Sequence, residues 1–278
     1  MMAIIGRVLV ISALAASATA CGAAQSKQGV KGRYVNSNGL KIYYEVHGAG
    51  KPLVLLHGAF ATAEGWQPLL PTLTKTRQII AIELQGHGHT ADRDTPLSFE
   101  QMADDTAAVL RELKISSADV FGYSMGGTAA LALAIRHPSL VGKLAILGSG
   151  TGSARDTYDP ATYKQMKSMT PQNFNFPVLK DPYTRVAPDP SKWPVLVAKL
   201  MKMEDDFKGF PAASVKSIKA QTLIMMGDRD AVLPEHAVEV FRLIPNSKLA
   251  IFPGGDHFML FTSTDKILAT LVPFLDAK

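Results

Sequence analysis

The chain has only one cysteine among 278 residues. A single cysteine cannot form a disulfide within the chain, so stability must come from a packed core. The sequence is not rich in charge either: charged residues make up 19% of it and hydrophobic residues 47%, a composition that excludes a disordered chain. The length suffices for one large domain with room for a sizeable insertion.

Dense positive charge is also missing. The net charge is +5, and the longest basic interval, residues 192–219, is interleaved with acidic residues. We interpret this interval as a solvated face, which argues against nucleic-acid binding. Long apolar runs are absent from the N-terminal segment, where the run from Val8 to Ala16 is too short to span a membrane.

The N-terminal segment has the layout of a secretory signal, with Arg7, then the apolar run, then small residues. Two endings remain open. Residues 18–20 (ATA) fit a cleavage site that releases a soluble protein, whereas SATAC, ending at Cys21, resembles the lipobox of bacterial lipoproteins and implies a lipid anchor on that cysteine. Position 18 is Ala, where the lipobox most often has Leu. We therefore predict a signal peptide over residues 1–21, a tether over 22–31, and export as a periplasmic, membrane-anchored or secreted protein.

The remainder, residues 32–278, alternates short apolar segments with amphipathic ones. The predicted strands cover residues 40–46, 52–56, 78–84, 118–123, 143–147, 221–226 and 248–252, and the main helices cover 98–113, 128–136, 237–243 and 264–275. Strands that alternate with helices indicate an α/β fold, with a mostly parallel sheet covered on both faces. The polar alternation of residues 40–46 predicts a strand at the edge of the sheet.

Residues 151–215 interrupt this rhythm and are rich in proline, methionine and phenylalanine. A helical stripe runs through them, formed by Trp193, Leu196, Val197, Leu200 and Met201. Pro194 fits the first turn of that helix. The segment is either an insertion packed on the sheet or a small lid whose apolar face lines a pocket, and we favour the lid.

One serine is surrounded by glycine, in VFGYSMGG at residues 120–127. A serine nucleophile must stand clear of the sheet, and a sharp strand-to-helix turn achieves this. At such a turn the residues two before and two after the serine approach closely, so only small side chains fit. The G-x-S-x-G pattern, placed after a predicted strand and before a predicted helix, therefore indicates a nucleophile elbow with Ser124 at its apex.

With this elbow, residues 32–278 resemble the alpha/beta-hydrolase fold family, in its esterase, lactonase and cofactor-free haloperoxidase-like branch. LVLLHGAF, residues 53–60, is similar to the family's strand followed by His-Gly. The resemblance implies an oxyanion hole made by the backbone amides of Ala59, or alternatively Phe60, and of Met125. It gives His57 a structural role.

The family's acid and base follow in the order Ser, Asp, His. GDRDAVLP, residues 227–234, resembles the family's acid loop and implies Asp230 as the acid, with Asp228 as a turn-forming alternative. KLAIFPGGDHF, residues 248–258, implies His257 as the base. We interpret His236 as a weaker rival, at the surface near the start of a helix.

The histidines of ELQGHGHT, residues 83–90, raise the question of a metal site. No further ligand cluster stands beside His87 and His89 in the sequence, so we predict no metal. The family commonly has Asp and Arg where Glu83 and Gln85 stand, which affects a structural hydrogen-bond network. GSGTG, residues 148–152, is not followed by the Lys-Ser/Thr of a phosphate loop, and we predict no cofactor.

These features predict a serine hydrolase of small apolar esters or lactones that acts through an acyl-enzyme. Three alternatives remain open. Perhydrolysis, as in the haloperoxidases, and carbon–carbon bond hydrolysis would use the same triad, whereas a non-catalytic binding protein would keep only the scaffold. No feature of the sequence indicates an oligomeric state.

Overall fold

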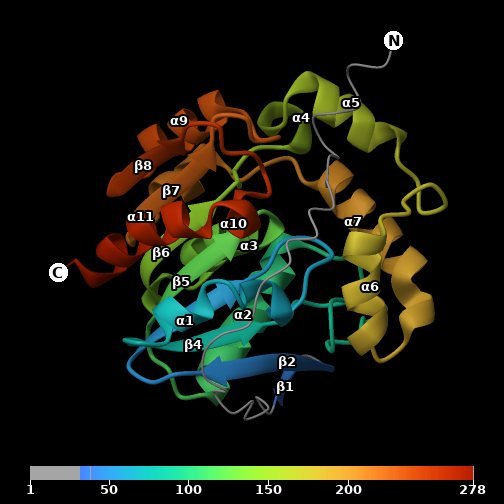
Figure 1. Cartoon of the computed structure of the whole chain (residues 1–278), viewed down its shortest axis with the longest axis horizontal. Coiled ribbons are helices and arrows are strands. Elements are labelled where there is room, and N and C mark those ends of the chain that lie inside the picture. The colour runs from blue at the N-terminus through green and yellow to red at the C-terminus, as the bar shows by residue number, and fades with distance from the viewer. Residues whose placement is uncertain (1–31, 38, 278) are drawn as a thin grey trace, which may run out of the picture.

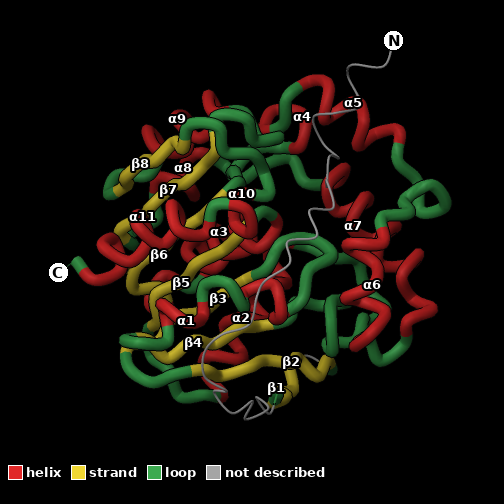
Figure 2. Tube along the Cα trace, in the orientation of Figure 1, coloured by secondary structure: helices red, strands yellow, loops and turns green. Residues whose placement is uncertain are grey.

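The computed structural model describes residues 32–37 and 39–277, which form an α/β fold around one eight-stranded sheet (Figures 1 and 2). The predicted signal peptide, the tether and Cys21 lie outside the described residues. Within the described part of the chain, every helix is too short or too polar to cross a membrane.

The sheet follows the order β1-β2-β4-β3-β5-β6-β7-β8. Its strands are β1 (Arg33–Ser37), β2 (Leu40–His47), β3 (Lys51–Leu56), β4 (Arg77–Ile82), β5 (Ala118–Tyr123), β6 (Val141–Leu147), β7 (Gln221–Gly227) and β8 (Ser247–Phe252). The six strands from β4 through β3 to β8 pair in parallel with their neighbours in this order. The β1–β2 and β2–β4 pairs are antiparallel. The predicted strand 40–46 is therefore not the edge strand, because β1 pairs along its outer side.

Helices cover both faces of the sheet. They are α1 (Leu70–Leu73), α2 (Phe99–Glu112), α3 (Met125–Arg136), α4 (Ala154–Thr157), α5 (Pro160–Ser168), α6 (Pro177–Val186), α7 (Trp193–Asp206), α8 (Ala212–Lys216), α9 (Pro234–Leu243), α10 (Met259–Thr262) and α11 (Thr264–Asp276). Apolar residues of α2, α3 and α9 share one buried cluster, and those of α1, α10 and α11 share the other.

Strand β3 shows why the central strands read as continuous apolar runs. Leu53 and Leu55 belong to the cluster on one face of the sheet, while Val54 and Leu56 belong to the cluster on the other. All four side chains are fully buried. A strand with helices on both sides has no face left for polar residues, so the alternation seen in edge strands disappears.

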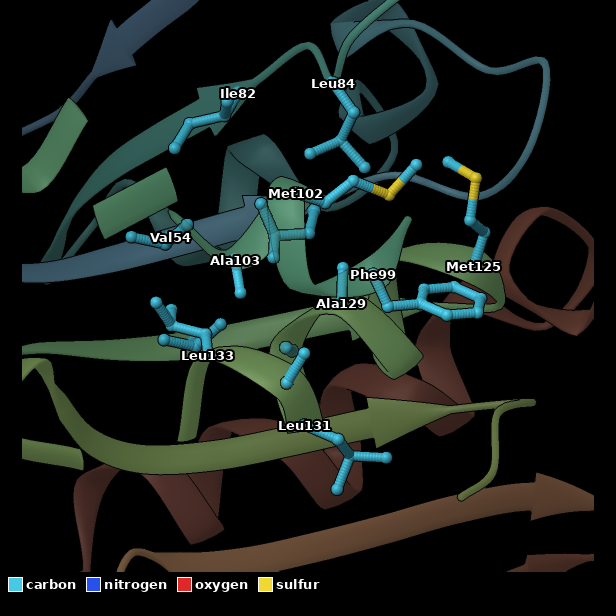
Figure 3. Close-up of a cluster of buried hydrophobic side chains, with 14 of the residues drawn as sticks. Val54, Ile82, Leu84, Phe99, Met102, Ala103, Met125, Ala129, Leu131 and Leu133 are labelled. Carbon is cyan, nitrogen blue, oxygen red and sulfur yellow. The ribbon is translucent and has the colours of Figure 1, made fainter. Parts of the chain in front are cut away.

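Helices α2 and α3 pack together against one face of the sheet. Phe99 and Met102 of α2 lie near Met125 and Ala129 of α3, as Figure 3 shows. Ser98 caps α2, because its side chain accepts a hydrogen bond from the amide of Gln101. This packing fixes the first turn of α3, which directly follows Ser124.

The chain between β6 and β7 leaves the sheet and forms helices α4 to α8. In Figure 1 the longer helices of this segment, α5, α6 and α7, lie to one side of the sheet. We call residues 151–215 the helical insertion. Helix α7 begins at Trp193 with Pro194 in its first turn, and it buries Trp193, Leu196, Val197 and Leu200, as the stripe predicts.

Candidate active site

Ser124 stands at the sharp turn between β5 and α3. Its backbone has φ 52° and ψ −124°, a conformation that residues other than glycine rarely adopt. The turn is held by a hydrogen bond from the Ser124 amide to the carbonyl of Leu147 on β6. The neighbouring strand thus helps to hold Ser124 in a strained backbone conformation, which costs about 1–3 kcal/mol.

The glycines around Ser124 are required by close backbone contacts. A Cβ at Gly122 would lie 2.3 Å from the carbonyl oxygen of Gly126, and a Cβ at Gly126 would lie 2.0 Å from that of Leu56. Neither backbone could shift without opening the turn. This geometry is the one that the G-x-S-x-G spacing predicts.

The structure brings the predicted nucleophile, base and acid together from three separate loops. The hydroxyl of Ser124 lies 3.0 Å from Nε2 of His257, and Nδ1 of that ring lies 2.7 Å from Oδ1 of Asp230. The loops that carry these residues follow β5, β7 and β8, and all leave the sheet at the carboxyl ends of parallel strands.

Neighbouring side chains position this constellation. The carboxylate of Asp228 accepts a hydrogen bond from the amide of Gly254 at 2.7 Å, so it holds the loop that precedes His257. Tyr123 donates a hydrogen bond to the carbonyl of His257 at 2.7 Å. The sequence pattern assigns no role to Tyr123, although an aromatic residue directly before the serine is a visible signal.

Opposing effects set the pKa of His257. Burial lowers it, whereas the Asp230 carboxylate raises it by charge and by hydrogen bonding, and the net pKa is above the ordinary histidine value. Asp230 therefore stabilises the charged imidazolium, as a triad acid does.

The two backbone amides predicted to form the oxyanion hole are free of backbone partners in the described loops and at the start of the helix. Met125 is the first residue of α3, so its amide has no partner within the helix. The amide of Ala59 donates to no backbone carbonyl in the loops that the structure describes. Both residues, together with Ser124, line the same cavity.

His57 is fully enclosed and holds the loop after β3. Its Nδ1 bonds to the carbonyl of Gly58, and its Nε2 accepts a hydrogen bond from the amide of Leu84. Burial, followed by the nearby His87, lowers the pKa of His57 to about 3, so the ring stays neutral at physiological pH. These contacts agree with the structural role expected for this residue.

Glu83 organises the turn that carries the other two histidines. Its carboxylate accepts hydrogen bonds from the amide of Ala63 and from the ring of His89, and His87 bonds to the carbonyl of Gln85. Glu83, which stands where the family commonly has Asp, thus still takes part in a structural hydrogen-bond network. In residues 32–37 and 39–277, no group of three or more His, Cys, Asp or Glu side chains is arranged to hold a metal ion.

The interpretation of His236 as a surface residue is wrong. Its side chain is buried, and its Nε2 accepts hydrogen bonds from the amides of Thr151 and Gly152. The GSGTG segment needs its small residues here, since a Cβ at Gly150 would lie 2.5 Å from this ring. His236 therefore anchors the start of the helical insertion.

A cavity of about 310 Å³ lies between Ser124 and the helical insertion. Its walls are mostly apolar, and the insertion contributes Met166, Met169, Met201, Phe174 and Phe176. Phe60, from the loop that carries Ala59, stacks near Phe174 at a ring distance of 4.6 Å. The cavity suits an apolar group joined to a reactive carbonyl beside Ser124.

A second, much smaller cavity of about 20 Å³ also borders Ser124. Its lining combines the hydroxyl-bearing residues Thr128, Ser149 and Thr157 with apolar residues such as Phe99 and Phe207. Tyr158 and Glu204 line both cavities, so they stand where the two cavities adjoin.

Comparisons with known proteins agree with this geometry. The model of the "Alpha/beta hydrolase family" matches residues 53–270. The 2-hydroxymuconate semialdehyde hydrolase of Pseudomonas sp. (strain CF600) is 25% identical over 88% of this chain and 93% of its own length. The pimeloyl-[acyl-carrier protein] methyl ester esterase of Legionella pneumophila (strain Lens) is 26% identical over 85% of this chain and 100% of its own length.

A solved structure shares the fold over a similar extent. Est816, described as an N-acyl homoserine lactone degrading enzyme, is 26% identical with a TM-score of 0.70, covering 87% of this chain and 99% of its own. The matching family model spans most of the chain, including β3, the elbow at Ser124, and His257. On these grounds the chain belongs to the alpha/beta hydrolase family.

Proposed function

We propose that this protein hydrolyses carboxylic esters or lactones through an acyl-enzyme intermediate. Ser124 is the nucleophile, His257 the general base and Asp230 the acid that orients the ring. The observation that carries the proposal is the continuous contact from Asp230 through His257 to Ser124, beside a cavity sized for a small substrate. The lactone- and ester-degrading relatives support it.

The proposed reaction follows from this geometry. The Ser124 oxygen attacks the substrate carbonyl carbon while Nε2 of His257 takes the hydroxyl proton. The amides of Ala59 and Met125 stabilise the oxyanion of the tetrahedral intermediate, and each such donor is worth roughly 10²–10³ in turnover. His257 then gives its proton to the leaving alkoxide. Water then attacks the acyl-enzyme by the same steps and releases the carboxylic acid product.

A second candidate is hydrolysis of a bond other than an ester. The relative named for 2-hydroxymuconate semialdehyde favours it, because that named compound is not an ester. The same serine and histidine would serve a carbon–carbon bond hydrolase. Perhydrolysis differs only in that hydrogen peroxide replaces water in the attack on the acyl-enzyme.

The test is hydrolysis of a chain-length series of p-nitrophenyl esters and of matched lactones by the purified protein, beside Ser124→Ala. We expect wild-type turnover and a loss of about 10⁶-fold in the variant. Labelling of Ser124 by a fluorophosphonate without ester turnover would shift the assignment to the second candidate. Turnover of 2-hydroxymuconate semialdehyde would then test that candidate. Turnover retained by Ser124→Ala would refute the proposed nucleophile, and neither turnover nor labelling would favour a binding protein.

We also propose that the protein acts after export, on the basis of the signal-like segment at residues 1–21. Labelled palmitate incorporated by the wild type but not by Cys21→Ser would support a lipoprotein. Secretion without any label would support the alternative cleavage after Ala20.

A further inference from the structure

Glu204 is an unusual residue for the wall of an apolar cavity. It lies on α7 of the helical insertion, is partly buried, and lines both cavities next to Ser124. It also continues the apolar stripe of that helix, since it follows Leu200 by four positions and Val197 by seven. A carboxyl group at such a position needs an explanation, because burial of an unpaired charge is costly.

The neighbouring acidic residues have charged partners, whereas the Glu204 carboxyl group has none among the residues that the structure describes. Asp205 pairs with Lys167 at 2.7 Å, and Asp206 pairs with Lys202 at 2.8 Å. No hydrogen bond or ion pair with another described residue engages the Glu204 carboxyl group. Burial, with a smaller effect of Asp205, raises the pKa of Glu204 to about 7.

The hydroxyl of Tyr158 accompanies Glu204 at the junction of the two cavities. Burial is the main cause that raises the pKa of this phenol, and the charge of Glu204 is the next. The described residues provide no hydrogen-bond partner for the hydroxyl either. Tyr158 and Glu204, whose polar groups have no hydrogen-bond partner among the described residues, thus line a space whose other walls are largely methionine and aromatic side chains.

We propose that Glu204, assisted by the Tyr158 hydroxyl, forms a polar subsite that binds a hydrogen-bond donor of the substrate and excludes a carboxylate. A carboxyl group accepts hydrogen bonds in both of its protonation states, so a donor is the partner that suits it at any pH. Above the pKa of Glu204, where its carboxyl group is ionised, a substrate carboxylate would instead meet a like charge. Among the described residues that line the cavity, Lys167 is the only lysine, and it already pairs with Asp205.

The subsite therefore selects esters or lactones that carry a hydroxyl, an amide N–H or an ammonium group in addition to their apolar part. Most of the remaining wall residues are apolar, and the carboxylate of Asp205 is already paired with Lys167. This inference rests on the proposed function only in taking the cavity as the place where substrate binds.

Binding of non-ester probes tests the subsite without needing turnover. The probes are hexanamide, hexylammonium and hexanoate, with homologues of other chain lengths. Calorimetry on the purified protein at pH 8, above the pKa of Glu204, gives their dissociation constants. We expect the wild type to bind the amide and the ammonium at least about tenfold more tightly than the carboxylate, as for hydrogen bonds to charged groups. Equal binding of all three would overturn the proposal.

Variants at position 204 separate the sources of this preference. Glu204→Gln keeps the shape and an acceptor oxygen, so it should retain the amide and lose the advantage of the ammonium. Glu204→Leu should lose both preferences. The matched control is Asp206→Asn, which removes a charge from the same helix at a residue paired with Lys202 and should preserve the wild-type order.

Two outcomes would contradict the assignment. The wild-type order of probe affinities could survive in Glu204→Leu. Alternatively, Asp206→Asn could change this order as much as Glu204→Leu does, which would indicate a general electrostatic field rather than a contact. Because no probe is an ester, the ranking stays measurable even if Ser124→Ala keeps its turnover. Conversely, loss of turnover in Ser124→Ala with a ranking independent of residue 204 would remove only the subsite.

Discussion

The sheet and the helical insertion contribute different physical properties to the same cavity. The loops after β5, β7 and β8 carry Ser124, Asp230 and His257 on strands whose pairing fixes their spacing. The insertion adds no strand to the sheet, and its helix α5 buries no residue. Its cavity-lining side chains include flexible methionines, which adapt to different shapes.

This difference teaches where catalysis and selectivity are expected to reside. Positions held by backbone hydrogen bonds and close glycine contacts tolerate little change, so substitutions there should alter the rate constant. Walls made of flexible side chains tolerate change, so substitutions there should alter which substrate is preferred.

The largest expected effect separates the two acidic residues of the loop after β7. Asp230→Asn should lower kcat by roughly 10⁴-fold, because the amide no longer holds His257 in the correct tautomer. Asp228→Asn loses charge in a hydrogen bond to Gly254 and should cost far less. Kinetics on the best p-nitrophenyl ester measure both, and the reverse order would move the acid to Asp228.

The pH profile should report the state of His257. The ring must be neutral to act as a base, and its raised pKa means that activity falls as pH drops through a value above about 6.5. Below this value kcat/KM should decrease about tenfold per pH unit. Asp230→Asn removes the charge that raises the pKa of His257. The acid limb of the residual activity should therefore move to lower pH. An unmoved limb would contradict the role of Asp230.

Two methionines of α7 compare the cavity wall with the core. Met201 lines the cavity, whereas Met203 is 4% exposed and packs in the core cluster. Met201→Ala should shift the preferred ester toward longer acyl chains, with changes of about tenfold in kcat/KM. Met203→Ala should preserve that preference and lower the free energy of unfolding by about 2–5 kcal/mol. Both are measured by the ester series and by urea denaturation, and a shift caused by Met203→Ala alone would refute the comparison.

The smallest expected effect concerns an ion pair between the insertion and the sheet domain. Arg185 of α6 lies 2.9 Å from Glu64, and both side chains are 60% exposed. Such pairs contribute less than about 1 kcal/mol, so Arg185→Gln should barely change the free energy of unfolding. A destabilisation well above this value in urea denaturation would mean that the insertion depends on this contact.

The sequence predicted those elements whose pattern is complete within a short segment. The bounds of β5, the cap at Ser98 and the close glycine contacts at Gly122 and Gly126 all follow from local periodicity or sterics. It did not predict β1, which lacks a strong apolar signal, or the burial of His236. That ring is buried because the GSGTG segment, far away in the chain, donates its amides to it.

The sequence by itself determined the turn that exposes Ser124, because backbone sterics and apolar periodicity act between neighbours in the chain. Asp230 and His257 followed from the resemblance of their segments to the hydrolase family. Only the tertiary structure decided the 2.7 Å and 3.0 Å contacts among them, since these depend on how three strands pair. It also decided that Glu204 faces a cavity. The helical stripe specifies one face of α7, but only the packing of the insertion over the sheet specifies what that face meets.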